Sequence, residues 1–163
     1  MPPSAASNID PTPAFAFGHG IAYGTFSWSD PSASATALRV DGSISVSLTV
    51  RNDGDRDGIE VVQLYLRDPV ASVVRPTQRL VGYARIPARP GEETQVSFDV
   101  PADLAAFSGS DGRRIVEPGV IVLGFGRSSA DIVAECSVMI EGDVRVLDHQ
   151  RALHAGVNVQ QHS

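Results

Sequence analysis

One turn-rich segment between two strand-like runs constrains the fold of this chain more than any other feature. Residues 44–50 alternate apolar and polar side chains, which predicts a strand with one buried face. Residues 59–66 are rich in Val, Leu and Tyr, which favour strands. Residues 52–58, between the runs, are mostly Asn, Asp and Gly, so the sequence predicts a β-hairpin. The structural turn residues are expected to be Asn52, Gly54, Asp57 and Gly58.

Short strands separated by Gly, Pro and Asp continue along the rest of the chain. One helical turn is predicted at 101–107, where Pro101 opens the turn and Leu104 and Phe107 lie three residues apart. This pattern predicts an all-β, Greek-key β-sandwich of about seven to eight strands. Besides the two runs above, the expected strands are 25–28, 36–40, 79–86, 94–100, 113–116, 120–125 and 131–140.

Composition narrows the classes of partner and cofactor. The formal charge of -6 disfavours nucleic acid and anionic membrane surfaces. No apolar run approaches the roughly 20 residues that span a bilayer, and residues 1–12 do not have the pattern of a signal peptide. The single Cys136 alternates with Ala134 and Val138 and is expected to be a buried small hydrophobe. No cofactor is expected.

Five ordered segments resemble one known family. Residues 50–69, with Val-Arg-Asn-Asp-Gly at their start and Leu-Tyr-Leu-Arg-Asp-Pro at their end, are similar to the signature of the fibronectin-III-like domain that closes many glycoside hydrolase family 3 β-glucosidases and β-xylosidases. Residues 15–26 resemble the segment that leads into this module from the second catalytic domain. Residues 75–83, 90–92 and 111–119 follow in the family's order.

The resemblance covers residues 13 to about 140 and implies a domain plan. It implies a flexible lead at 1–14, an interdomain segment at 15–26, and a fibronectin-III/immunoglobulin-like sandwich at 27–142. Residues 143–163 show no sustained period and are expected to be a disordered tail. The sequence departs from the family's pattern at Ala16, where Pro is usual, and at Arg114, where Trp is frequent.

The resemblance also implies a function. The two catalytic carboxyl groups of a family 3 glycosidase belong to the domains that precede this module, so no catalytic residue is assigned in this chain. The implied role is a non-catalytic accessory module that stabilises the enzyme, docks onto its catalytic domains and shapes the approach of substrate. The compartment is not predicted, because any export signal would lie at the start of the parent protein.

An apolar outer face is the basis of the docking hypothesis. In the strand after the turn, the face opposite Val62, Leu64 and Leu66 is also partly apolar, which is unusual for a face exposed to water. Ordinary cross-strand pairing on an exposed sheet is the competing interpretation. The interdomain docking residues are expected to be Phe15, Phe17, Gly18, His19, Gly20, Tyr23, Val61, Tyr65, Val81 and Tyr83.

Two alternative functions stay open. A carbohydrate-binding module that contacts polysaccharide would need exposed aromatic rings, for which Trp28, Tyr65 and Tyr83 are the candidates. A calcium-dependent interaction domain would use Asp53, Asp55, Asp57 and Glu60. The Asp-rich turn matches the first half of an EF-hand loop, but position twelve is Leu64 instead of a bidentate Glu, so a structural turn without metal is favoured.

Overall fold

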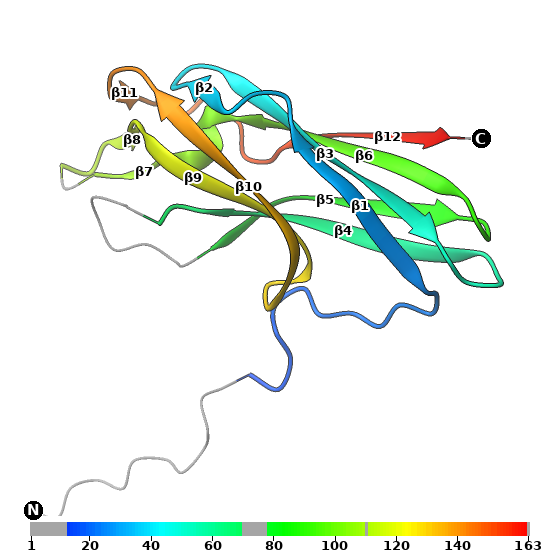
Figure 1. Ribbon diagram of the computed structural model, residues 1–163. Helices are drawn as coiled ribbons and strands as arrows, with labels where there is room; N and C mark the ends of the chain where they lie inside the picture. The colour runs from blue at the N-terminus through cyan, green and yellow to red at the C-terminus, as the bar shows by residue number, and fades with distance from the viewer. Residues whose placement is uncertain (1–12, 70–77, 110, 163) are drawn as a thin grey trace, which may run out of the picture.

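The protein is a β-sandwich, and the computed structural model describes residues 13–69, 78–109 and 111–162 (Figure 1). One sheet has the order β1-β3-β6-β12 and consists of β1 (Phe26–Ala33), β3 (Ser43–Asn52), β6 (Glu93–Pro101) and β12 (Gly156–His162). The other has the order β2-β10-β9-β4-β5 and consists of β2 (Ala37–Arg39), β10 (Asp131–Glu141), β9 (Gly119–Ser128), β4 (Gly58–Arg67) and β5 (Arg79–Ala88).

Short elements close one end of the sandwich. They are a small sheet of β11 (Arg145–Val146), β8 (Arg114–Val116) and β7 (Phe107–Ser108), and the 3-10 turn η1 (Ala102–Ala105). The pairing of β2 with β10 is parallel and the other pairings are antiparallel. β4 lies beside β9, far away in sequence, as Greek-key connections require. The predicted all-β sandwich is therefore confirmed. Within the described residues, no helix has the length and apolar character needed to cross a membrane.

The core lies between the two sheets and follows the predicted alternation. Val46, Leu48 and Val50 of β3 are fully buried, as are inward residues of β4, β6 and β9. The rings of Phe98 and Phe125 meet across the core with centroids 6.1 Å apart. Full burial of each such side chain stabilises a fold by roughly 1.5–3 kcal/mol. Cys136 packs against this core and is half-buried, and burial raises the pKa of its thiol.

The predicted hairpin between β3 and β4 is wrong. β3 pairs with β1 and β6, whereas β4 pairs with β5 and β9, so the Asp-rich loop crosses from one sheet to the other. A hairpin and such an arch can have the same alternation of apolar and polar residues and the same turn residues, so the sequence pattern did not distinguish them. In this arch β3 and β4 lie in opposite sheets, and their apolar faces meet across the shared core.

The expected disordered tail also differs from the structure. β12 adds to the sheet edge beside β6 in continuous register from Gly156 to His162. Its Val157 and Val159 remain about half exposed, so the strand is held mainly by backbone hydrogen bonds. Such bonds leave no apolar pattern in the sequence, and the strand was therefore not predicted. The expected flexible lead lies almost wholly outside the described residues.

Candidate docking site

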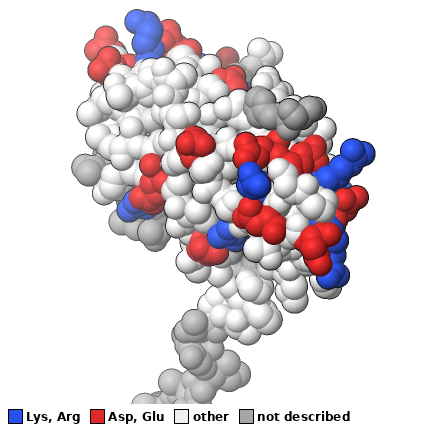
Figure 2. Space-filling model, turned by 45° about the vertical axis from the view of Figure 1, so that its right-hand side comes forward, with Lys and Arg blue, Asp and Glu red and all other residues white. Residues whose placement is uncertain are grey.

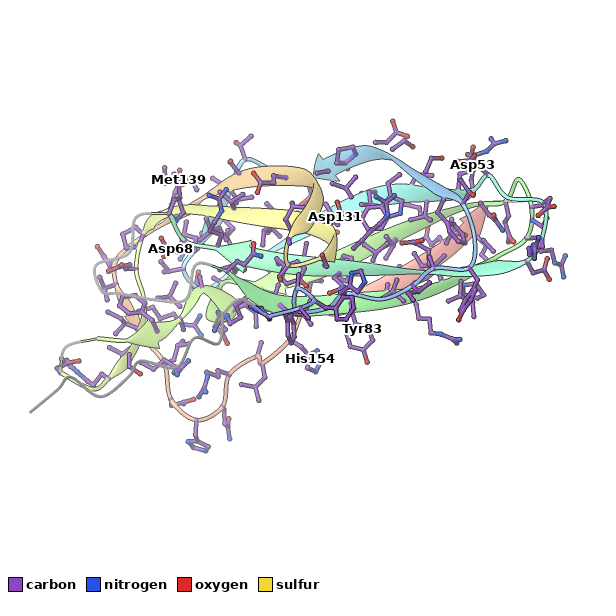
Figure 3. All side chains as sticks on the ribbon, turned by 90° about the horizontal axis from the view of Figure 1, so that it is seen from below. Asp53, Asp68, Tyr83, Asp131, Met139 and His154 are labelled. Atoms are coloured by element: carbon purple, nitrogen blue, oxygen red, sulfur yellow. The ribbon has the colours of Figure 1, made fainter. Side chains whose placement is uncertain are left out.

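Residues 15–26, called the strap below, run along the outer face of β4 and β5 before the chain enters β1 (Figures 1 and 3). Backbone hydrogen bonds fix the strap near both ends. At one end the Ser129 amide donates to the Phe17 carbonyl at 2.8 Å. At the other end the Asp53 amide donates to the Thr25 carbonyl, also at 2.8 Å. The strap is therefore attached to the β9–β10 turn and to the arch between the sheets.

Two side chains of β4 strengthen the first attachment. Gln63 Nε2 donates to the Gly18 carbonyl at 2.9 Å and to the Arg127 carbonyl at 2.7 Å. The Tyr65 hydroxyl donates to Gln63 Oε1 at 2.6 Å and lies 3.4 Å from the Phe17 carbonyl oxygen. Burial raises the pKa of the Tyr65 phenol, which keeps the hydroxyl protonated as a donor.

Gly18 is the residue that allows this close approach. Its φ of +78° lies in the left-handed region that favours glycine. A Cβ at this position would overlap Gln63 Oε1 and lie 2.7 Å from the Tyr65 hydroxyl oxygen. Gly20 differs, because no atom lies within 4 Å of a Cβ built there. Of the two predicted glycines, Gly18 is therefore the one that packing requires.

Four large side chains of the strap are largely exposed. Phe15, Phe17, Ile21 and Tyr23 are between 67% and 90% exposed. The ring of His19 stacks on that of Phe15, with centroids 4.9 Å apart. The strap has no Lys, Arg, Asp or Glu, and Figure 2 shows charged side chains gathered elsewhere, over the end of the sandwich that faces the viewer. The strap is thus an uncharged ridge with an immobilised backbone and exposed apolar side chains.

The predicted outer face is correct for Val61, Tyr65 and Tyr83 and wrong for Val81. Val61 and Tyr83 point outward and are exposed, Tyr83 by 65%. Tyr65 also points outward but is only 3% exposed, because the strap covers it. Val81 is buried in the core. It is the extra residue of a β-bulge, since Leu64 pairs with Gly82 and Tyr65 with Leu80.

An ion pair between the buried Glu60 and the partly exposed Arg127, which no sequence pattern predicted, lies next to this site. Glu60 is almost fully buried, and burial raises the pKa of its carboxyl, while Arg127 opposes the shift with its Nε 3.8 Å away. The Arg127 guanidinium also lies 4.8 Å from the centroid of the Trp28 ring. Trp28 packs partly buried against the core and is not the exposed sugar platform that was considered. The sequence around Trp28 did not predict its contact with Arg127, because the two residues are far apart in the chain.

The Asn52 side chain holds the arch together. The buried Asn52 side chain donates from Nδ2 to the carbonyls of Arg56 at 2.9 Å and Ala88 at 2.8 Å, and its Oδ1 accepts from the Gly54 amide. Asp53 is paired with Arg51, and Asp55 with Arg56. In the described part of the chain, no three His, Cys, Asp or Glu side chains gather in a way that could hold a metal ion.

Comparison with known proteins agrees with the fold. Residues 60–129 match the model of the fibronectin type III-like domain. A β-xylosidase of Formosa agariphila is 39% identical over 133 residues, which are 81% of this chain and 18% of that protein. A β-glucosidase of Bacteroides ovatus is 39% identical over 121 residues, 74% of this chain and 16% of that protein. The chain thus spans less than a fifth of the length of these relatives.

Solved structures give the same result. A β-glucosidase from Listeria innocua in complex with glucose superimposes with a TM-score of 0.76 at 30% identity, covering 87% of this chain and 19% of that one. β-Glucosidase 3B from Thermotoga neapolitana gives a TM-score of 0.74 at 29% identity, covering 84% and 18%. The predicted resemblance is therefore confirmed: residues 60–129 match the fibronectin type III-like domain, and most of the chain is similar to a small part of glycoside hydrolase family 3 β-glucosidases and β-xylosidases.

Proposed function

We propose that the chain is a non-catalytic accessory domain of a family 3 β-glycosidase, and that the strap docks it onto the catalytic part of the same enzyme. The observation behind this proposal is the contrast within the strap. Its backbone is fixed by Gln63, Ser129 and Asp53, yet its Phe15, Phe17, Ile21 and Tyr23 side chains stay exposed. Exposed apolar patches of this kind mark interaction surfaces.

An ordered backbone makes the strap suited to binding. Fixing a residue's backbone costs about 1–2 kcal/mol of conformational entropy. Because the sandwich already orders the strap backbone, binding a partner would not have to lose that entropy. Tyr83, exposed on the neighbouring β5, extends the same surface. The relatives supply the partner class, since more than four fifths of their length lies outside the matched region.

Binding between this chain and the rest of the polypeptide encoded by its gene tests the docking proposal. Phe17→Ser and Tyr83→Ser should each weaken that association by about tenfold. Both variants should change the unfolding free energy of the chain alone by under about 1 kcal/mol, because the rings are exposed. Val146→Ser, at a half-exposed valine of β11 at the other end of the sandwich, is the matched control. Equal losses in the chain alone and in the complex would contradict docking.

The non-catalytic proposal has its own test. The purified chain should not hydrolyse aryl β-glucosides or β-xylosides. Asp57 and Glu92 are the acidic residues to replace, because both line a groove between the strap and the outer face of β4 and β5. Turnover that disappears in an Asp57→Asn, Glu92→Gln double variant would show that the chain is an enzyme after all.

A further inference from the structure

A groove of about 800 Å³ lies between the strap and the sheet edge. Ile59, Val61 and Pro87, from the outer faces of β4 and β5, form an aliphatic side, and Ile21 and Tyr23 of the strap form another. Polar residues of the loops and of β12 complete the lining: Asp57, Arg89, Glu92 and Gln161.

The strap does not fill this groove. It is attached at Phe17 and Gly18 on one side and at Thr25 on the other, and the residues between these attachments include the exposed Ile21 and Tyr23. At Gly20 there is open space. Ile59 and Val61 therefore remain about 40% exposed, although residues of this type are usually covered.

The lining favours a protein side chain over a sugar as the occupant. Sugar rings stack on aromatic faces, and among the described residues this groove has a single aromatic one, Tyr23 on the strap side, beside mainly aliphatic neighbours. The rim has two carboxylates, Asp57 and Glu92, against the one guanidinium of Arg89, a net charge of −1 that complements a basic group. In the curated relatives, more than 80% of the polypeptide lies outside the matched region. A segment of that remaining polypeptide could therefore occupy the groove.

We propose that this groove receives an apolar loop of the catalytic part, with a basic residue beside it that faces Asp57 and Glu92. This inference rests on the proposed docking function and adds a second contact to it, beside Ile21 and Tyr23 of the strap. The strap is then held between the sandwich and the catalytic part, instead of lying at the rim of their interface.

Val61→Ser tests the groove and Phe17→Ser tests the ridge, with Val146→Ser as control for both. Affinity for the separately produced remainder of the polypeptide is measured by calorimetry, and folding of each variant by urea unfolding. We expect Val61→Ser to reduce affinity about tenfold, Asp57→Asn to reduce it about threefold at low salt, and Val146→Ser to leave it unchanged.

The outcomes separate the two proposals. Undiminished affinity of Val61→Ser together with weakened Phe17→Ser would overturn the groove proposal and leave docking intact. An absence of association for the unmodified chain would overturn both. If instead a soluble β-linked oligosaccharide, added alone, stabilises the unmodified chain but not Val61→Ser, the occupant is a sugar and the groove proposal is wrong.

Discussion

The hydroxyl of Tyr65 donates a hydrogen bond to Oε1 of Gln63, 2.6 Å away and two residues earlier on the same face of β4. This contact orients the Gln63 amide so that its Nε2 reaches the carbonyls of Gly18 and Arg127. One pair of side chains on an outer sheet face thereby joins the strap to β9. The position of the proposed docking ridge depends on this pair.

Tyr65→Phe should destabilise the chain by about 1 kcal/mol, the usual contribution of one hydrogen bond. Gln63→Leu should cost more, about 2 kcal/mol, because it leaves two carbonyls and the tyrosine hydroxyl without their partner. Urea unfolding measures both. Tyr83→Phe, at an exposed ring on the neighbouring strand, should change stability by under about 0.5 kcal/mol. A double-mutant cycle that gives no coupling between positions 63 and 65 would contradict the arrangement.

Gly18→Ala should release the strap without unfolding the sandwich. The added Cβ would overlap Gln63, and alanine disfavours the φ of +78° by about 1 kcal/mol. Limited proteolysis should then cut the strap at its aromatic residues much faster than in the unmodified chain. Gly20→Ala is the control, because its Cβ would meet open space. Equal cleavage rates in the two variants would argue against a specific attachment at Gly18.

Asn52→Ala should lower stability by about 3 kcal/mol, because it leaves buried backbone groups of the arch and of the β5 end without partners. Chemical denaturation gives the value. The exposed Asn158 of β12 provides a matched control, for which Asn158→Ala should cost under about 0.5 kcal/mol. If the two substitutions prove equally mild, Asn52 does not organise the arch.

Glu60 should make stability depend on pH. Its folded-state pKa is raised above the ordinary value of 4.5 by burial, so the folded protein binds this proton more tightly than the unfolded chain does. The cost of the ionised carboxylate is fully present above the folded pKa and is removed as the pH falls through that value toward 4.5. Comparison of unfolding free energies with Glu60→Gln between about pH 4 and 7 isolates this contribution, and parallel curves would refute it.

The sandwich and its core could be predicted from the sequence alone. Alternation in residues 44–50 correctly identified Val46, Leu48 and Val50 as buried, since side chains of a strand point alternately to its two faces. The ordered motifs identified the fibronectin type III-like family. They also singled out the strap, including Gly18, whose conformation and packing the structure then explains.

The pairing of the strands and the cover of their outer faces could not be predicted from the sequence and follow from the tertiary structure. The period of two is the same in a hairpin and in an arch, so it could not place β3 and β4 in different sheets. It could not reveal that Val81 is a bulge residue that turns into the core, because one extra residue reverses every face after it. Nor could it show that the strap buries Tyr65 or that β12 completes a sheet edge. These features depend on contacts between residues far apart in sequence, and a local sequence pattern carries no information about such contacts.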